Sequence, residues 1–215
     1  MKIAPEGVPF VIGGLVVLVA FALLARWLAA PGWVALPLAW LPIAVWIPFF
    51  FRDPARTGPR DEQLVLAPAD GRVVSVTEVQ EPDLIQGPAL QIAIFMNVLN
   101  VHVNRHPVDG TVVLRAYRPG KFFNASLDKA SADNEQMSLG IASARGPVLV
   151  RQIAGLIARR IVTDPTVGER VQQGARLGLI RFGSRVETLL PPGAVARVAI
   201  GERTRAGVTV IAAWP

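Results

Sequence analysis

Residues 68–74 read PADGRVV, and the same pattern returns at residues 107–113 as PVDGTVV. A second pattern, GERVQQG at residues 168–174, returns at residues 201–207 as GERTRAG. Each copy places glycine where a hairpin or bulge needs a positive φ. Repeated hairpins at this spacing predict a β-rich body of the sandwich or barrel type.

From about Leu64 onward the chain consists of short β-branched runs that are broken by Asp-Gly, Pro-Gly and single glycines. Such runs are typical of strands joined by tight turns. Strands are expected at residues 72–79, 90–95, 111–117 and 195–200. Only residues 152–161 have apolar residues at helical spacing, with two arginines in the last turn, where cations suit the helix dipole. The sequence therefore predicts a mainly β domain with few helices.

Two apolar segments precede this body. Residues 9–30 carry a single charge, Arg26, and residues 33–51 carry none. A membrane-spanning helix needs about 20 apolar residues, and both segments approach that length. A signal peptide is disfavoured because the first stretch is too long and a second follows at once, which leaves a buried core hairpin as the alternative. We expect a membrane-associated helical hairpin in residues 1–55 and a second domain in residues 56–215.

The flanks of the hairpin bear on its orientation. Three prolines within residues 37–48 weaken the second helix, so a spanning hairpin and a shallow interfacial one both stay open. Three arginines within residues 52–60 follow it, and positive residues that flank a span stay cytoplasmic. The second domain is therefore expected at the cytoplasmic face of the cell inner membrane.

Charge narrows the class of partner. The 215 residues carry a formal net charge of +6, and the basic residues are 19 Arg and only 3 Lys. Because the guanidinium group binds phosphate in a bidentate fork, nucleic acid and an anionic membrane surface are both candidates. The apolar N-terminal segments favour the membrane surface over nucleic acid. The chain has no cysteine, which excludes disulfides, thiolate metal sites and a cysteine nucleophile.

Few residues can carry chemistry. The only histidines are His102 and His106, whose spacing suits a metal on a helix, but their segment has the pattern of a strand or turn and contains no Glu. We therefore predict no metal site. Ser184, in residues 177–187 (LGLIRFGSRVE), is the only serine that follows a glycine. A Gly-Ser pair alone usually marks a turn, and no Gly-x-Ser-x-Gly elbow of an α/β-hydrolase occurs.

Three motifs, one of which contains the Gly-Ser pair, occur in a fixed order along the chain. They are Ala67-Pro-Ala-Asp70-Gly71, Phe95-Met-x4-Val101-His102-x2-Arg105-x-Pro107 and Phe182-Gly183-Ser184-Arg185. In this order, with Gly-Ser near the C-terminus, they resemble the three signatures of phosphatidylserine decarboxylases. Residues 120–125, Lys129 and residues 134–135 resemble the short, compact members of that family, and the match runs from Leu64 to Pro215. The chain departs from the family at Gln136, which stands where an arginine is usual, and at His106, which stands where short members carry a small residue.

The resemblance implies a proenzyme that cuts itself between Gly183 and Ser184. Ser184 Oγ attacks the carbonyl of Gly183, and β-elimination from the resulting ester releases the chain that ends at Gly183 and leaves dehydroalanine. Hydrolysis of the dehydroalanine, with loss of ammonia, gives a pyruvoyl group derived from Ser184. His102 and Asp70 occupy the family positions of the base and of the carboxylate that orients it. Replacing either one with alanine is expected to block or slow this maturation. The product is a heterodimer of its own two chains, residues 1–183 and 184–215.

The resemblance also implies the reaction. The pyruvoyl carbonyl forms a Schiff base with the amine of phosphatidylserine and acts as the electron sink for loss of CO2, which yields phosphatidylethanolamine without a metal or an added cofactor. His102 is the candidate proton donor. Candidates for binding the phosphate are Lys121, Lys129 and Arg105, although an ordinary solvated surface charge is an equally strong interpretation of each.

Two alternatives remain open. In the first, the chain is a pyruvoyl enzyme of this type that acts on archaetidylserine or a small amino acid, although the apolar hairpin argues for a lipid. In the second, the chain is a membrane-anchored, non-catalytic module, since residues 167–178 resemble a lipoyl or biotinyl carrier hairpin. Such carriers need a lysine at the hairpin tip, and none of the three lysines lies near the C-terminal hairpins.

Overall fold

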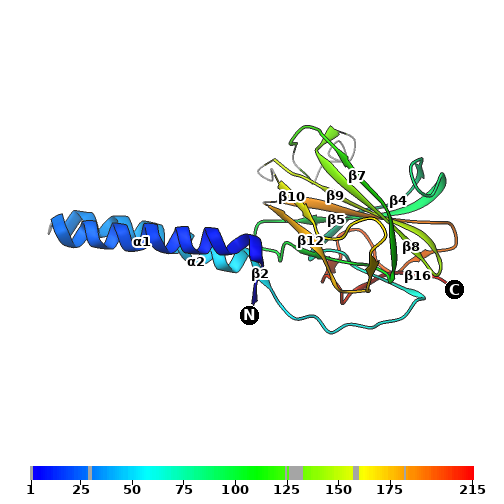
Figure 1. The fold of residues 1–215 in the computed structure, drawn as a ribbon, viewed down its shortest axis with the longest axis horizontal. Coiled ribbons are helices and arrows are strands. Elements are labelled where there is room, and N and C mark those ends of the chain that lie inside the picture. Colours follow the sequence, from blue (N-terminus) through cyan, green and yellow to red (C-terminus); the bar gives the residue numbers. More distant parts are fainter. Residues whose placement is uncertain (1, 29–30, 124, 126–132, 157–159, 182) are drawn as a thin grey trace. The chain divides into compact units, whose positions relative to one another are not determined.

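The computed structural model describes the chain except residues 1, 29–30, 124, 126–132, 157–159 and 182. It divides into two compact units, Met1–Ala55 and Arg56–Pro215. The first is helical and the second is built of strands (Figure 1).

The N-terminal unit is a helical hairpin. Its helices α1 (Val8–Leu28) and α2 (Ala35–Phe50) lie side by side, and Trp40 Nε1 donates a hydrogen bond to the Gly14 carbonyl at 2.9 Å. The remaining elements of the unit are β1 (Lys2–Ile3), η1 (Pro5–Gly7), η2 (Pro31–Val34) and β2 (Arg52–Asp53), with β1 and β2 paired antiparallel. The helix α2 continues through Pro42 and Pro48.

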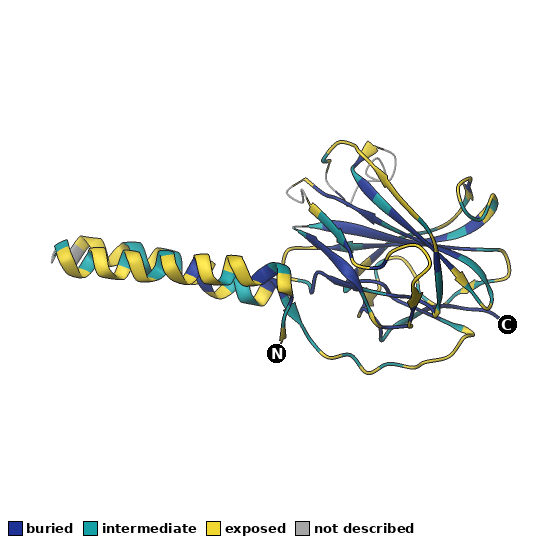
Figure 2. Cartoon of the chain, viewed as in Figure 1, coloured by how far each residue is buried: buried dark blue, intermediate teal, exposed yellow. Residues whose placement is uncertain are grey.

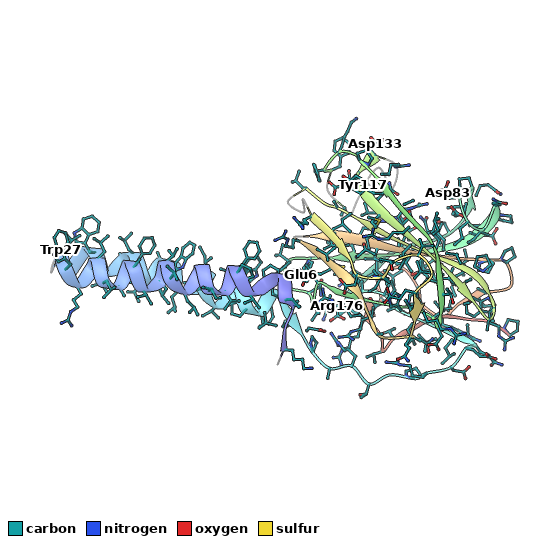
Figure 3. All side chains as sticks on the ribbon, viewed as in Figure 1. Glu6, Trp27, Asp83, Tyr117, Asp133 and Arg176 are labelled. Atoms are coloured by element: carbon teal, nitrogen blue, oxygen red, sulfur yellow. The ribbon has the colours of Figure 1, made fainter. Side chains whose placement is uncertain are left out.

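Both helices are long and apolar enough to cross a membrane by length and composition. The mean hydropathy is 2.7 for Pro5–Leu28 and 1.8 for Gly32–Phe50. Only 6% and 11% of the most apolar 18-residue stretch of each is buried. Figure 2 accordingly shows the hairpin mostly exposed. Trp27, at the far end of α1, is 80% exposed and projects from the helix (Figure 3). A core helix of a soluble domain would be mostly buried, so these surfaces favour association with a membrane.

The C-terminal unit is organised around a curled, fully antiparallel sheet of eight strands. In spatial order they are β11 (Arg170–Val171), β7 (Gly110–Arg118), β8 (Gln136–Ser143), β9 (Gly146–Ile153), β13 (Ser184–Leu190), β5 (Gly87–Met96), β4 (Gly71–Glu81) and β15 (Arg203–Thr204). Two smaller sheets complete the unit. They are β10 (Arg160–Thr163), β12 (Arg176–Arg181) and β6 (Val103–Arg105), and β14 (Val195–Ala196), β16 (Val210–Ala213) and β3 (Leu64–Leu66).

The core lies on one face of the large sheet. Since successive side chains of a strand alternate between faces, Ile94, Met96 and Val186 point together into one buried cluster. Ser184 is paired with Met96 and so belongs to the same row. The middle of the sheet is buried in Figure 2. The fold therefore pairs β13 with β5 from Ser184 onward and with β9 from Arg185 onward.

The predicted β architecture and helical hairpin are confirmed. Strands β4, β5 and β7 contain the predicted residues 72–79, 90–95 and 111–117. The fourth predicted strand is shorter than residues 195–200, since β14 ends at Ala196.

The predicted helix at residues 152–161 is wrong. Strand β9 runs to Ile153, strand β10 begins at Arg160, and residues 157–159 lie outside the described residues. Gln152 pairs with Met137 of β8 and with Val186 of β13, in the middle of the sheet. Long-range pairing on both sides thus overrides the local apolar spacing.

The two sequence repeats form equivalent structures. Asp70 Oδ1 accepts a hydrogen bond from the Ala206 N–H at 2.7 Å, and Asp109 Oδ1 accepts one from the Gln173 N–H at 2.9 Å. Each Asp-Gly pair of the first repeat thus caps one hairpin of the second. Gly168, Gly174, Gly201 and Gly207 of the second repeat have positive φ as predicted. The prediction is wrong for Gly71 and Gly110 of the first repeat, which lack positive φ and instead make room for the carbonyl oxygens of Phe95 and Ala142 on the neighbouring strands.

Candidate active site

The Gly183–Ser184 peptide lies at the start of β13. Ser184 is fully buried, and its Oγ donates a long hydrogen bond of 3.5 Å to Met96 Sδ. Gly183 has a φ of +66°, a conformation that glycine adopts without the steric cost of a side chain. The scissile bond of the predicted cleavage thus joins a left-handed glycine to a serine that is fixed in the sheet.

His102 contacts this peptide directly. Its Nδ1 lies 3.0 Å from the carbonyl oxygen of Asn100, and the N–H of Gly183 donates to its Nε2 at 3.4 Å. A carbonyl only accepts hydrogen bonds, so this pairing places the ring proton on Nδ1 and leaves the Nε2 lone pair facing the peptide. The side chain is fully buried. The geometry suits a base beside Ser184.

Gly155 forms the other side of the peptide. A Cβ at Gly155 would overlap the carbonyl oxygen of Gly183 and would lie 3.3 Å from the Cβ of Ala125. The Gly183 carbonyl therefore fits only because residue 155 has no side chain. Sequence reasoning missed this residue, since a single glycine at the end of an apolar run carries no sign of a distant contact.

Asp70 has partners other than His102. Its Oδ2 forms an ion pair with Arg56 Nη2 at 2.7 Å, and its Oδ1 accepts from the Ala206 N–H. In the described conformation the carbonyl of Asn100 is a partner of His102 Nδ1, while the Asp70 carboxylate binds Arg56 and Ala206. Asp70 still adjoins the site through Gly71, whose Cα packs against the carbonyl oxygen of Phe95, just before the segment that leads to His102.

Buried charges anchor the other face of β13. Arg185 Nε lies 2.9 Å from Glu187 Oε1, and Arg151 Nη1 lies 3.4 Å from Glu187 Oε2. Glu187 is fully buried and Arg185 is 2% exposed. Removing one partner of such a cluster leaves an uncompensated buried charge, so the cluster holds the strand after Ser184 in one register. The sequence analysis named Arg185 only as part of a motif.

Of the predicted phosphate-binding residues, the structure describes Arg105 and Lys121, which have different surroundings. Arg105 lies against the C-terminal hairpins, where its Nη1 donates to the Gly174 carbonyl at 3.1 Å. Lys121 has a side chain that is 70% exposed, with its Nζ 4.0 Å from Asp133 Oδ2. Lys129, like Phe182 of the third motif, lies outside the described residues.

The residues that follow Lys121 are tied to the site by Asn134. Its Nδ2 donates to the carbonyls of Phe123 and Ala154, at 2.9 and 2.8 Å, and its Oδ1 accepts from the Phe123 N–H. Gln136, which replaces the family's arginine, donates to the Asn134 carbonyl at 3.2 Å. Asn134 thus fixes the backbone that leads into Gly155.

His106 lies in a different environment from His102. It is 2% exposed and borders a cavity of about 220 Å³ that is also lined by Asp164, Glu169 and Arg176. Burial lowers the pKa of His106 from 6.5 to about 4, against a smaller opposing effect of Glu169. Among the described residues no group of three or more His, Cys, Asp or Glu side chains could hold a metal ion.

This burial makes stability depend on pH. The unfolded chain binds a proton at His106 below pH 6.5, whereas the folded chain does so only below about pH 4. Stability is therefore expected to fall as the pH drops through this window, by about 2 kcal/mol at pH 5 relative to pH 7. The measurement is thermal unfolding of wild type and His106→Gln in detergent at pH 7 and pH 5. An equal loss of stability in both proteins would contradict this assignment.

Comparisons with known proteins point to one family. A family model described as phosphatidylserine decarboxylase matches residues 43–212. A protein of Symbiobacterium thermophilum, named phosphatidylserine decarboxylase proenzyme, is 48% identical over 99% of this chain and 96% of its own length. A protein of Granulibacter bethesdensis with the same name is 50% identical over 97% of this chain and 84% of its own.

Proposed function

This chain belongs to the phosphatidylserine decarboxylase family, a family of carboxy-lyases, and we propose that it is a proenzyme that cuts itself at Gly183–Ser184 and then converts phosphatidylserine to phosphatidylethanolamine. The observation that carries the proposal is the contact between His102 Nε2 and the Gly183 N–H at 3.4 Å, beside a buried serine. The two curated relatives, named as proenzymes, support the cleavage.

Cleavage requires a nucleophile, a base and an open carbonyl. Ser184 Oγ attacks the Gly183 carbonyl carbon, and His102 Nε2 takes the hydroxyl proton, because serine is a weak nucleophile until it is deprotonated. The left-handed conformation of Gly183 and the missing side chain of Gly155 make room for the carbonyl in this position. His102 then returns the proton to the Ser184 nitrogen as the Gly183–Ser184 C–N bond breaks, which leaves an ester between Ser184 Oγ and Gly183. We propose that Asp70 assists this step by holding the start of β4, next to the segment that carries His102.

The site fits a pyruvoyl group formed from Ser184. After cleavage, residue 184 becomes the start of its own chain, and the pairing of β13 with both β5 and β9 keeps it in place. Residue 184 is fully buried and lies beside Met96. The pyruvoyl group would supply the electron sink for decarboxylation. His102 is the side chain placed to hold and return a proton there.

The lipid substrate agrees with the N-terminal hairpin. Its exposed apolar helices suit the cytoplasmic face of the inner membrane, with three arginines in residues 52–60 on the cytoplasmic side. A decarboxylase of soluble amino acids has no need of such a hairpin. Phosphatidylserine is itself a component of a bilayer that such a hairpin would enter.

The direct test is an activity assay of the full chain in mixed micelles. Wild type is expected to release CO2 from carboxyl-labelled phosphatidylserine and to form phosphatidylethanolamine, with free serine not turned over, while Ser184→Ala forms neither product. An ether-linked archaetidylserine assayed in parallel measures the alternative substrate. A fully matured wild type that leaves phosphatidylserine unchanged would refute the proposed substrate.

A further inference from the structure

An arginine-rich cleft adjoins the segment that carries His102. It has a volume of about 770 Å³ and is lined by side chains from β4, β15 and the segment after β5. The lining residues that matter here are Arg72, Arg203, Arg205, Asn97, Leu99 and Asn100. Asn100 is the residue whose carbonyl holds His102 Nδ1, so the cleft and the base share one short segment.

The cleft carries an uncompensated positive charge. Arg72 and Arg203 are direct cross-strand partners. Like charges that face each other in this way destabilise a strand pair unless an anion lies between them. Within the described part of the chain, neither these two nor Arg205 has a carboxylate within 4.0 Å. The one carboxylate in the cleft, Asp70, is already paired with Arg56. An anionic ligand would relieve this repulsion.

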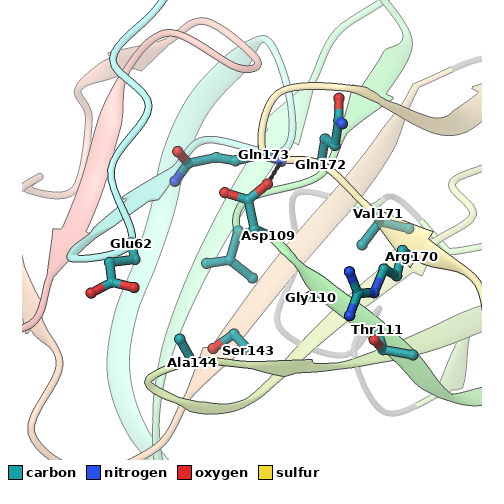
Figure 4. Close-up of a pocket in the computed structure, with 11 residues that line it drawn as sticks. Glu62, Asp109, Gly110, Thr111, Ser143, Ala144, Arg170, Val171, Gln172 and Gln173 are labelled. Carbon is teal, nitrogen blue, oxygen red and sulfur yellow. Dashed lines mark hydrogen bonds between the residues drawn. The ribbon is translucent and has the colours of Figure 1, made fainter.

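The internal repeat supplies a comparison within the same chain. The equivalent cleft, of about 520 Å³, is lined by residues from β7 and β11 and contains the Asp109–Gln173 hydrogen bond (Figure 4). There Arg170 pairs with Thr111 in the same register in which Arg203 pairs with Arg72. The repeat therefore aligns Arg203 with Arg170, Arg72 with Thr111, and Arg205 with Gln172.

This alignment shows which of the three arginines the fold itself does not require. The same turn and the same aspartate cap form with Thr111 and Gln172, so the fold does not require arginine at positions 72 and 205. The two additional arginines occur only in the copy that adjoins His102. A ligand explains that asymmetry, because planar guanidinium groups bind phosphate oxygens in a bidentate fashion.

Distance allows the cleft to serve the same reaction. Strands β4, β5 and β13 are consecutive in the sheet, and neighbouring strands lie about 4.8 Å apart, so Arg72 and Ser184 are about 10 Å apart at the backbone. Arg72 is in register with Phe95 and Arg185, whereas Ser184 is in register with Met96, so the two side chains leave opposite faces near the same end of the sheet. A headgroup that joins the two positions would therefore pass around these strand ends. We propose that Arg72, Arg203 and Arg205 bind the phosphodiester of phosphatidylserine while its amine reaches residue 184. Leu99, which is 60% exposed at the same cleft, would contact the apolar part of the lipid. This inference rests on the proposed function and replaces Lys121, Lys129 and Arg105 as the phosphate site.

The test exchanges residues between the two copies. The double variant Arg72→Thr/Arg205→Gln carries the residues of the other cleft, Arg203→Gln removes the third charge, and Arg170→Gln is the matched control. All are assayed as full chains in neutral detergent micelles, with cleavage monitored by mass. We expect full maturation, a KM for phosphatidylserine raised about tenfold or more in the first two variants with kcat within about threefold, and no change in the control.

The outcomes are distinct. An unchanged KM in both variants overturns the inference. If, in addition, the variants lose activation by added phosphatidylglycerol, the cleft binds an accessory lipid instead of the substrate. If the double variant fails to mature, binding of phosphatidylserine-containing micelles to uncleaved Ser184→Ala is measured with and without Arg203→Gln, and equal affinities overturn the inference. Failure of the proposed function is seen separately, because the wild type itself would then release no CO2.

Discussion

The variant Gly155→Ala is expected to remain almost wholly uncleaved. A Cβ at residue 155 would overlap the carbonyl oxygen of Gly183, so the scissile carbonyl must move away from its position beside Ser184. The backbone of Gly155 does not have the positive φ that favours glycine, so alanine is not strained there for its own sake. A displacement of about 1 Å in a positioned reacting group costs on the order of 100-fold in rate.

Gly87→Ala provides the matched control for this variant. Gly87 also lacks a positive φ, and the nearest atom to an added Cβ is the Ile85 carbonyl oxygen at 4.0 Å. The fraction cleaved is followed by gel electrophoresis during cell-free synthesis, and folding is compared by thermal unfolding. A folded Gly155→Ala that is cleaved as fast as Gly87→Ala would show that the carbonyl position does not limit maturation.

Replacing His102 with alanine is expected to slow cleavage by about 10²- to 10⁴-fold, the usual contribution of a general base. The reason is the position of Nε2, which accepts the Gly183 N–H at 3.4 Å and so lies beside the peptide whose serine must lose its proton. The rate is measured as the disappearance of the uncleaved chain after synthesis is stopped.

His106→Ala is the internal control for this second prediction, because His106 is the only other histidine and lies in a different cavity. It is expected to mature at a rate close to that of wild type. The reverse result, with rapid cleavage of His102→Ala and slow cleavage of His106→Ala, would show that His102 is not the base.

The parts of the fold that were predicted correctly rest on local signals. The Asp-Gly repeats fixed the starts of β4 and β7, because each glycine begins a long strand and each aspartate caps a hairpin. The two long apolar segments near the N-terminus correctly predicted the helical hairpin. Residues 152–161 were misassigned because pairing with β8 and β13, distant in sequence, decides their conformation.

The candidate site was predictable only where a motif names a residue. His102 and Ser184 belong to motifs, and the structure brings them to one peptide. Gly155 and the Arg72–Arg203–Arg205 cleft depend on contacts between segments far apart in the chain, which spacing cannot reveal. The pairing of Asp70 with Arg56 likewise depends on a long-range contact rather than on a motif.

The intact mass of the purified protein, beside that of Ser184→Ala, tests the central claim most directly. The account predicts that wild type separates into a chain that ends at Gly183 and a chain of residues 184–215 that is one ammonia lighter than the same peptide starting with serine. The variant is expected to stay whole. A wild-type protein that remains a single intact chain in a lipid or detergent environment would contradict the self-cleavage and, with it, the pyruvoyl chemistry.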